Sequence, residues 1–270
     1  MRIDLTGRTA IVTGSTAGIG RATAEGLVRA GTSVIVNGRT QARVDDAVEQ
    51  MRATFPGSPI SGIAADLSTA EGANAFIAHA PDADILVNNV GTAFLRAYEG
   101  IEDIAVIPGE DWLGLFQLNV MSGVRLSRHY LPRMVGKGWG RVVFVSSESA
   151  LNTPKEMLDY GMTKTAQLAV SRGLAEAVAG TGVTVNAVLL GPTRSEILGD
   201  YMAKQAAENG ITIEEAEQGF LQALRPTSLI RRFSTTDEIA NMIVYACSEQ
   251  ASATSGAALR VDGGVVRFVT

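Results

Sequence analysis

Residues 9–20 read TAIVTGSTAGIG and join a short apolar run to a glycine-rich turn, which opens a stretch of helical spacing. A strand, a glycine turn and a helix in this order can hold a pyrophosphate, because the first helical turn offers free N–H groups and a positive dipole. Gly14 suits the tight turn, Gly18 lets phosphates approach the backbone, and Gly20 lets the helix pack on the strand. We therefore expect a pyrophosphate-containing ligand here; a purely structural corner is the alternative.

Short apolar runs rich in Val and Ile alternate with longer stretches of helical spacing along the chain. This alternation is typical of strand–helix units on a parallel sheet, whose strands are buried on both faces. Seven strands are expected: Thr9–Val12, Ser33–Asn37, Ile60–Ala64, Asp84–Asn88, Arg141–Ser146, Thr184–Leu190 and Ala258–Val261. Six helices are expected between them: Gly18–Ala30, Gln41–Thr54, Ala70–His79, Asp111–Val135, Leu158–Gly180 and Thr236–Ser248. The sequence thus predicts an α/β fold of three layers, with a doubly wound, seven-stranded parallel sheet in the middle.

A long connection interrupts this regular alternation. About 40 residues, Arg194–Phe233, separate the sixth strand from the last helix, whereas such connections usually have ~4 to 6. Two helices with apolar faces are expected inside it, Glu196–Glu208 and Ile213–Leu224. Because loops beyond the carboxyl ends of parallel strands bind ligands, we expect a substrate lid, with ordinary packing as the alternative. No repeat or linker divides residues 1–270, so one domain is expected.

The composition limits the classes of partner. With 23 Lys and Arg against 28 Asp and Glu, the formal charge of -5 leaves no basic field for nucleic acid. A single cysteine, Cys247, and two scattered histidines, His79 and His129, predict neither a disulfide nor a metal site. No apolar segment reaches the ~20 residues of a membrane span, and no signal peptide precedes Gly7. We therefore expect a cytoplasmic protein that binds no membrane, nucleic acid or metal.

The end of the second expected strand bears on the choice of dinucleotide. An NAD site places Asp or Glu about 20 residues beyond the glycine turn, where the carboxylate binds the ribose hydroxyls. This chain has Asn37-Gly38-Arg39 there, and a guanidinium can pair with a 2′-phosphate and lie against adenine. Ala17 in the turn supplies no second cation. We expect NADP(H) to be preferred over NAD(H); a solvated Arg39 is the alternative.

Tyr160 and Lys164 stand four residues apart, and so one helical turn from each other on one face. A phenol with its ordinary pKa of ~10 is a poor proton shuttle at neutral pH. A cation ~5 Å away, at an effective dielectric of ~20, favours the phenolate by about 3 kcal/mol, or roughly two pKa units. We therefore expect Lys164 to lower the Tyr160 pKa and Tyr160 to act as acid and base. Tyr-x-x-x-Lys alone is common on solvated helix surfaces, so this interpretation depends on the other motifs of the chain.

Further motifs accompany this pair over nearly the whole chain. Ser147 ends the apolar strand thirteen residues before Tyr160. The complete set is Thr13–Gly20, Asp66, Asn88–Gly91, Asn119, Ser147, Tyr160, Lys164, Gly191–Thr193 and Val261–Gly264. In this combination the sequence resembles the short-chain dehydrogenases/reductases. The resemblance implies a Rossmann-type sheet and reversible hydride transfer between the nicotinamide of NADP(H) and a carbonyl or alcohol carbon.

The resemblance implies a role for each residue of the catalytic set, Asn119, Ser147, Tyr160 and Lys164. Tyr160 corresponds to the proton donor to the carbonyl oxygen, and Ser147 to the hydroxyl that holds and polarises this oxygen. Lys164 corresponds to the residue that lowers the tyrosine pKa and binds the nicotinamide ribose. Asn119, at a bend in its helix, corresponds to the residue that holds a water linking Lys164 to solvent.

The same resemblance implies a set of cofactor-binding residues. Asp66 matches a contact to the adenine edge, Asn88 and Gly91 match the adenosine-side loop, and Thr193 and Ser195 match the grip on the carboxamide. The full set is Gly14, Ser15, Thr16, Gly18, Ile19, Gly20, Arg39, Asp66, Leu67, Asn88, Gly91, Tyr160, Lys164, Thr193 and Ser195.

Two positions depart from the family's pattern. Val90 replaces the usual alanine, and Leu190 stands where proline usually precedes Gly191. Neither carries the chemistry, although Leu190 can loosen the turn that leads to Thr193 and Ser195.

The sequence leaves the substrate open. The expected lining of the entrance is Phe94, Leu95, Glu148, Lys155, Glu156 and Met157, an apolar pocket with a charged rim. A polar carbonyl compound, a polyol, a steroid and an acyl thioester are all compatible with it. A 3-oxoacyl thioester reductase is one alternative, in which Arg125 and Arg128 dock an acidic carrier protein. A regulator that binds NADP(H) without turnover is another, although the Ser, Tyr and Lys of the catalytic set are present.

Two long helices and the end of the chain predict self-association. Asp111–Val135 and Leu158–Gly180 are longer than one sheet face needs, and the resembled family packs this pair across a two-fold interface. The apolar tail Val265–Val269 can cross a second interface or pack on its own subunit. We expect a homotetramer or a homodimer.

Overall fold

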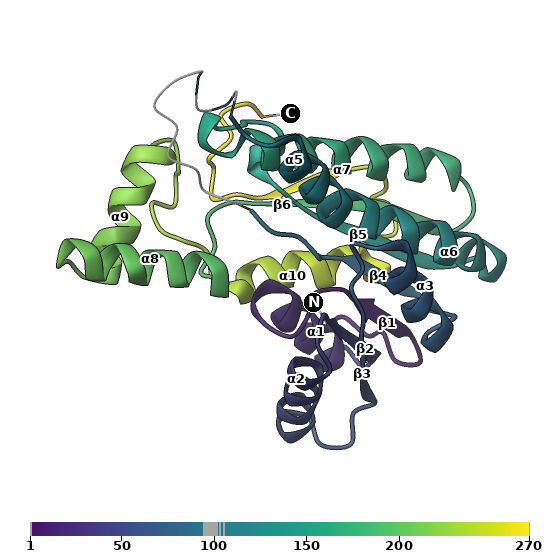
Figure 1. Cartoon of the computed structure of the whole chain (residues 1–270). Helices are drawn as coiled ribbons and strands as arrows, with labels where there is room; N and C mark the ends of the chain where they lie inside the picture. The colour runs from purple at the N-terminus through teal and green to yellow at the C-terminus, as the bar shows by residue number, and fades with distance from the viewer. Residues whose placement is uncertain (1, 94–101, 103, 105, 270) are drawn as a thin grey trace.

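A single parallel sheet runs through the computed structural model, which describes residues 2–93, 102, 104 and 106–269 (Figure 1). Its strands are β1 (Thr9–Val12), β2 (Ser33–Gly38), β3 (Ile60–Ala64), β4 (Ile85–Asn88), β5 (Gly140–Ser147), β6 (Val183–Leu190) and β7 (Ala258–Val261). They lie in the order β3-β2-β1-β4-β5-β6-β7. The strand order reverses between β1 and β4, which is where a doubly wound sheet forms a ligand crevice. The predicted α/β fold with a seven-stranded parallel sheet is confirmed.

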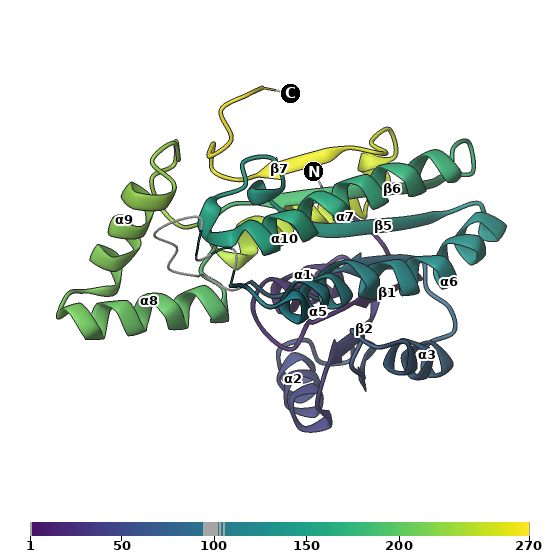
Figure 2. The same ribbon diagram turned by 45° about the horizontal axis from the view of Figure 1, so that its top comes forward.

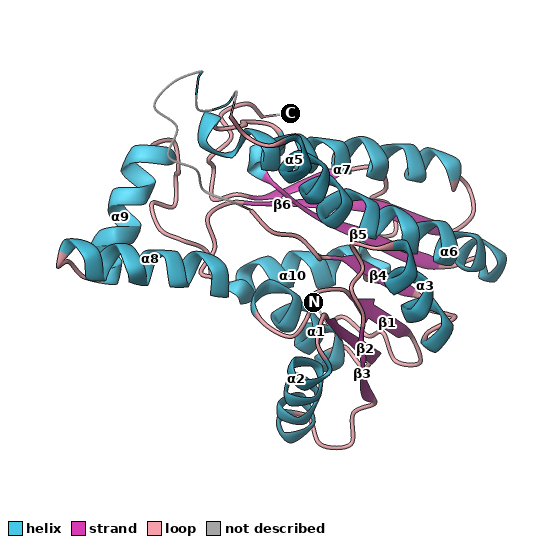
Figure 3. Ribbon diagram, in the orientation of Figure 1, coloured by secondary structure: helices cyan, strands magenta, loops and turns pink. Residues whose placement is uncertain are grey.

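Helices cover both faces of this sheet (Figures 2 and 3). One face carries α1 (Gly18–Arg29), α2 (Gln41–Thr54) and α10 (Thr236–Ala246), and the other carries α3 (Ala70–His79), α6 (Ser122–Lys137) and α7 (Leu158–Ala177). Successive strand residues enter opposite cores: Val143 and Val145 lie in the first, Val142 and Phe144 in the second. This period of two explains why the strands read as unbroken apolar runs, since both side-chain directions are buried.

The expected helix Asp111–Val135 is interrupted. It consists of α5 (Gly109–Phe116), a wide π-helical turn η1 (Gln117–Met121) and α6. The Ser122 N–H donates to the carbonyl of Gln117, five residues earlier, so the backbone has one residue more per turn there than an α-helix. The turn places Asn119 beside α7 (Leu158–Ala177), where its side chain donates to Thr163 Oγ1.

The long connection after β6 contains the two expected helices, α8 (Glu196–Asn209) and α9 (Ile213–Leu224). They project from one end of the sheet in Figures 1 and 2. A separate apolar cluster holds them together: Met202, Ala206, Ala216, Leu221 and Phe233. Thr212 and Glu215 form a capping box that starts α9, which gives this short helix a defined first turn.

Three short helical turns complete the described fold: η2 (Glu148–Ala150), η3 (Lys155–Met157) and η4 (Glu249–Ala251). In the tail, Val265 and Val266 are buried against their own chain, whereas Phe268 and Val269 are exposed. Among the described residues, no helix has the length and hydropathy needed to span a membrane.

Candidate active site

A cleft of about 1170 Å³ lies at the carboxyl edge of the sheet, where the segments that follow β1, β2, β4, β5 and β6 meet. Most of the residues predicted to act in catalysis or cofactor binding line it. They are Gly14, Thr16, Gly18, Ile19, Gly20, Arg39, Asp66, Leu67, Gly91, Ser147, Tyr160, Lys164, Thr193 and Ser195. Ser15, Asn88 and Asn119 are the predicted residues that lie behind this lining.

The glycine turn between β1 and α1 has the geometry of a phosphate cradle. Gly14 and Gly18 adopt left-handed backbone angles, with φ of 59° and 57°. A Cβ on Gly20 would lie 2.3 Å from the carbonyl oxygen of Gly14, so no larger side chain fits. Ala17, the residue before α1, provides no side-chain cap, which leaves the first N–H groups of α1 available to a ligand. These features fit the pyrophosphate of a dinucleotide.

Two asparagines hold this turn in place. Asn37 Oδ1 accepts a hydrogen bond from the N–H of Gly14 at 3.3 Å. Asn89 Nδ2 donates to the carbonyls of Thr13 and Gly14, both at 2.9 Å. The sequence alone does not predict this role for Asn37 and Asn89, because each contact joins segments far apart in the chain.

The side chains of Ser15 and Asn88 point away from the cleft, unlike those of most predicted cofactor-binding residues. Ser15 Oγ donates to the carbonyl of Val12 at 2.6 Å and accepts from the N–H of Asn37 at 3.1 Å. Asn88 Nδ2 donates to Ser127 Oγ at 3.3 Å, toward α6. These two side chains therefore support the loops around the cleft from behind.

The cleft end beside β2 carries two guanidinium groups and no carboxylate from β2. Arg39 is exposed and has no hydrogen-bond or ion-pair partner among the described residues. Arg43, in the first turns of α2, also lines the cleft and binds Glu196 of α8 at 2.9 Å. Arg43 thus provides a second cation near Arg39, which the glycine turn lacks. The sequence predicted only a helical position for Arg43, so its place in the cleft was not expected.

Ser147, Tyr160 and Lys164 meet on the opposite wall. Ser147 ends β5, and Tyr160 and Lys164 lie one turn apart on α7, with Lys164 Nζ 5.4 Å from the centroid of the Tyr160 ring. The Tyr160 hydroxyl forms a hydrogen bond with Ser147, whose Oγ also accepts from the N–H of Ser149 at 3.1 Å. Ser147, Tyr160 and Lys164 therefore lie next to one another in the lining of the cleft.

Burial controls the charges of this pair. It raises the pKa of Tyr160 to about 12, against the smaller lowering effect of the hydrogen bond to Ser147. Burial also lowers the pKa of Lys164 to about 7. The expected lowering of the Tyr160 pKa by Lys164 is therefore wrong for the protein chain itself. Burial is the largest cause of the Tyr160 shift and the cause of the Lys164 shift, because it penalises the charged form of each side chain.

Asn119 lies 1% exposed in η1, and its polar atoms have protein partners. Its side chain accepts from the N–H of Thr92 at 2.9 Å and donates to Thr163 Oγ1 at 2.9 Å. Its carbonyl accepts from Gln167 Nε2 at 2.6 Å, and Gln167 Oε1 in turn accepts from Lys164 Nζ at 3.2 Å. A glutamine amide thus joins Asn119 to Lys164, and the expected water between these residues stays a prediction.

A buried ion pair forms the wall next to Ser147. Arg225, directly after α9, donates from Nε to Glu148 Oε1 at 2.7 Å, and both side chains are 5% exposed or less. Burial raises the pKa of Glu148, and the adjacent Arg225 opposes this shift. Glu148 was expected on a charged rim. It is instead buried in this wall, because Arg225 at the end of α9 packs against it.

The remaining expected entrance residues divide into three groups. Met157 lines the cleft, whereas Lys155 and Glu156 do not. Phe94 and Leu95 lie outside the described residues. From the region of the expected lid, Ile197, Leu198, Tyr201 and Phe220 face the cleft. This side of the cleft is therefore mostly apolar.

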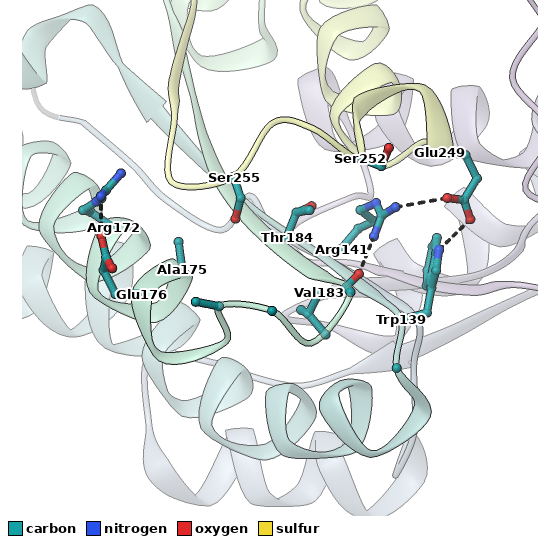
Figure 4. A pocket seen from close by; sticks show the side chains of 14 residues that line it. Trp139, Arg141, Arg172, Ala175, Glu176, Val183, Thr184, Glu249, Ser252 and Ser255 are labelled. Atoms are coloured by element: carbon teal, nitrogen blue, oxygen red, sulfur yellow. Dashed lines mark hydrogen bonds and ion pairs between the residues drawn. The ribbon is translucent and has the colours of Figure 1, made fainter.

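A second hollow, of about 530 Å³, lies at the opposite edge of the sheet, where β5 and β6 begin (Figure 4). Arg141 is its most buried charged residue. Its guanidinium donates to the carbonyls of Gly182 and Ser248 at 3.1 and 3.2 Å, and to Glu249 at 3.3 Å. Because these protein acceptors already use its donors, we assign the chemistry to the first cleft.

Comparisons with known proteins agree with this geometry. The family model described as short chain dehydrogenase matches residues 8–210. The oxidoreductase YvaG of Bacillus subtilis (strain 168) is 42% identical over 269 residues, which is 100% of both chains. The D-beta-hydroxybutyrate dehydrogenase of Cupriavidus necator is 33% identical over 97% of this chain and 99% of that protein.

A solved structure shows the same fold with ligands bound. L-Sorbose reductase from Gluconobacter frateurii, complexed with NADPH and L-sorbose, superimposes with a TM-score of 0.92. It is 30% identical to this chain, and the match covers 100% of both chains. The sequence family, the full-length relatives and the fold lead to one conclusion: the chain belongs to the short-chain dehydrogenase family, whose members are oxidoreductases that bind a nicotinamide cofactor.

Proposed function

We propose that this protein reduces the carbonyl group of a small hydroxylated compound with NADPH, and that Tyr160 donates the proton. The observation that carries this proposal is the shared cleft, in which an uncapped glycine turn faces the hydroxyls of Ser147 and Tyr160 and the ammonium of Lys164. One end can hold a dinucleotide, and the other can hold and protonate a carbonyl oxygen.

The chain's own residues supply the proton and the orientation. The bound nicotinamide supplies a hydride to the carbonyl carbon, and the carbonyl oxygen takes a proton to give the alcohol. With its pKa raised to about 12, Tyr160 is a neutral phenol at pH 7 and gives up its proton only to a strong base, which the carbonyl oxygen becomes as the hydride reaches the carbonyl carbon. The Ser147 hydroxyl donates a hydrogen bond to the same oxygen and fixes its position. Asn119 holds Thr92 and α7 in place behind these groups.

Arg39 and Arg43 support the preference for NADP(H). Two guanidinium groups at the adenosine end favour a ligand with an additional phosphate, and β2 ends without the carboxylate that an NAD ribose would need. The solved L-sorbose reductase holds NADPH.

Polar groups beside the catalytic hydroxyls support a hydroxylated substrate. Glu148, Ser149 and Arg225 lie on this wall of the cleft and bond to one another, but Glu148 Oε2 has no hydrogen-bond partner among the described residues. An apolar chain packed there would leave this buried oxygen unpaired, whereas a substrate hydroxyl can donate to it. L-Sorbose, the sugar bound in the solved reductase, has hydroxyls on the carbons around its carbonyl.

The acyl-thioester alternative receives less support. Arg125, one of the two arginines assigned to carrier docking, donates to the carbonyl of Ser68 at 3.0 Å and binds Gln117. Arg128 remains exposed on α6. One free arginine gives an acidic carrier a weak site on this face.

The proposal extends to the organisation of the protein. We propose one domain over residues 1–270, in which α8, α9 and the segments around them (194–233) close over the substrate. We propose further that the protein is cytoplasmic and assembles as a homodimer or homotetramer through α5, α6 and α7.

The test is NADPH oxidation at neutral pH with ketoses, hydroxyketones, unsubstituted ketones and a 3-oxoacyl thioester. We expect turnover with the hydroxylated compounds. Tyr160→Phe should reduce kcat by about 10²-fold to 10⁴-fold, the usual contribution of a general acid. Tyr245→Phe, on α10 away from the cleft, is the matched control and should keep full activity. Tight NADPH binding without oxidation of any compound would identify a regulator instead, and turnover of the thioester alone would identify an acyl reductase.

A further inference from the structure

Gln167 occupies a buried position between two residues of the catalytic set. It lies on α7, three residues after Lys164, and is 1% exposed. Its Oε1 accepts from Lys164 Nζ at 3.2 Å, and its Nε2 donates to the Asn119 carbonyl at 2.6 Å. Gln167 does not line the cleft, so it acts on a ligand only through its neighbours.

The orientation of this amide follows from its partners. An ammonium has only donors and a carbonyl only accepts, so the oxygen of Gln167 has to face Lys164 and the nitrogen has to face Asn119. A flipped amide would place two donors together at one end and two acceptors at the other. The side chain therefore has one favourable orientation, which links α7 firmly to η1.

The link fixes the direction of the Lys164 ammonium. Of its three donors, one is used by the carbonyl of Val145 at 2.9 Å and a second by Gln167. The third is left for the cleft, which Lys164 lines. The loop after β4 lies close to the same atom, since a Cβ on Gly91 would be 3.4 Å from Lys164 Nζ.

We propose that Gln167 is a positioning residue for the reaction, which holds the Lys164 ammonium against η1 and aims its remaining N–H into the cleft. The proposal rests on the proposed function, since it concerns the same site.

The groups around Lys164 make the effect measurable. Among the described residues, the titratable side chain that faces Lys164 is Tyr160, while η1 contributes the amide-linked Asn119 and β5 a backbone carbonyl. The Glu148–Arg225 pair acts on the Tyr160 side of the site. Burial already lowers the pKa of Lys164 to about 7, and we expect a change in the acceptor at residue 167 to shift this pKa further.

The test uses two variants of nearly the same size as glutamine. Gln167→Met removes the acceptor, so the ammonium is less favoured and the basic limb of the kcat–pH profile should move to lower pH by about one unit. Gln167→Glu places a negative charge beside Lys164 and should move this limb to higher pH. We expect Gln167→Met to lower kcat about tenfold while the substrate KM stays unchanged, because residue 167 does not touch the cleft.

Ser171→Ala is the matched control, since Ser171 is equally buried one turn further along α7 and its hydroxyl has no partner among the described residues. It should leave the pH profile in place. A ¹³C NMR titration of the Lys164 side chain reads the same two shifts without turnover, so the proposal can be tested even if no substrate reacts. Shifts of opposite sign support it. Shifts in one direction, or none, in variants that circular dichroism shows to be folded would overturn it.

Discussion

At the scale of single residues, burial shifts the pKa values of Lys164 and Tyr160 in opposite directions. Lys164 falls from 10.5 to about 7, while Tyr160 rises to about 12. At pH 7 Tyr160 is therefore a neutral phenol, whereas Lys164 is about half protonated. Burial keeps the proton on the tyrosine, and it makes the charged form of the lysine a cost in stability.

That cost depends on pH with a defined sign. Between about pH 7 and pH 10.5 the unfolded chain keeps the Lys164 proton that the folded chain has lost, so the stability of the fold rises with pH. Lys164→Met should therefore stabilise the protein at pH 7, by on the order of a few kcal/mol, and this gain should shrink toward pH 10. Urea unfolding across this range measures it. Lys204→Met, at an exposed site, is the control; a gain for Lys164→Met that stays constant with pH would contradict the expectation.

The proposed preference for NADP(H) depends on Arg39 at the same scale. Arg39→Ala should raise the KM for NADPH at least tenfold, since a charge-assisted hydrogen bond contributes about 1.5–3 kcal/mol, and should leave the KM for NADH unchanged. Arg128→Ala, an exposed arginine on α6, serves as the control. An unchanged NADPH KM would disprove the role of Arg39.

At the scale of elements, the join between β1 and α1 depends on Gly20. A Cβ there would lie 2.3 Å from the Gly14 carbonyl and 2.5 Å from Asn89 Nδ2, so Gly20→Ala should cost about 1–3 kcal/mol or more and weaken cofactor binding. Gly173→Ala, in open space within α7, should instead stabilise the protein by about 0.5–1 kcal/mol. Thermal unfolding of both variants distinguishes local crowding from a general effect of alanine. Equal effects of the two changes would argue against the close approach.

The sequence predicted the strands to within a residue or two at most ends, because a strand buried on both faces leaves an apolar run. The apolar pattern did not predict η1, because a single extra residue in a helical turn leaves the pattern on either side intact; only the family resemblance implied a bend at Asn119. Contacts between distant segments were also missed. Gln167 reads as an ordinary helix residue until η1 is placed beside it, and Arg225 and Glu148 are 77 residues apart in the chain.

At the scale of the whole molecule, the cluster around Phe233 is separate from the two cores that enclose the sheet. Phe233 is 2% exposed and packs edge-on against Phe220, with ring centroids 5.5 Å apart. Phe233→Ala should remove about 3–5 kcal/mol of packing from residues 194–233 while the sheet stays folded. Limited proteolysis should then cut within this segment first. Phe76→Ala, in the main core, should instead lower the midpoint of global unfolding, and the same pattern for both variants would contradict a separate lid.

The ion pair between Arg43 and Glu196 crosses the cleft and joins α2 on one side to α8 on the other. A phosphate that binds Arg43 competes with Glu196 for the guanidinium. Cofactor binding and the position of α8 therefore belong to one thermodynamic cycle. The two equilibria are then coupled reciprocally. If cofactor binding weakens the Arg43–Glu196 contact by some factor, formation of that contact weakens cofactor binding by the same factor. Both groups are more than half exposed, so added salt should weaken this coupling well before it disturbs the fold.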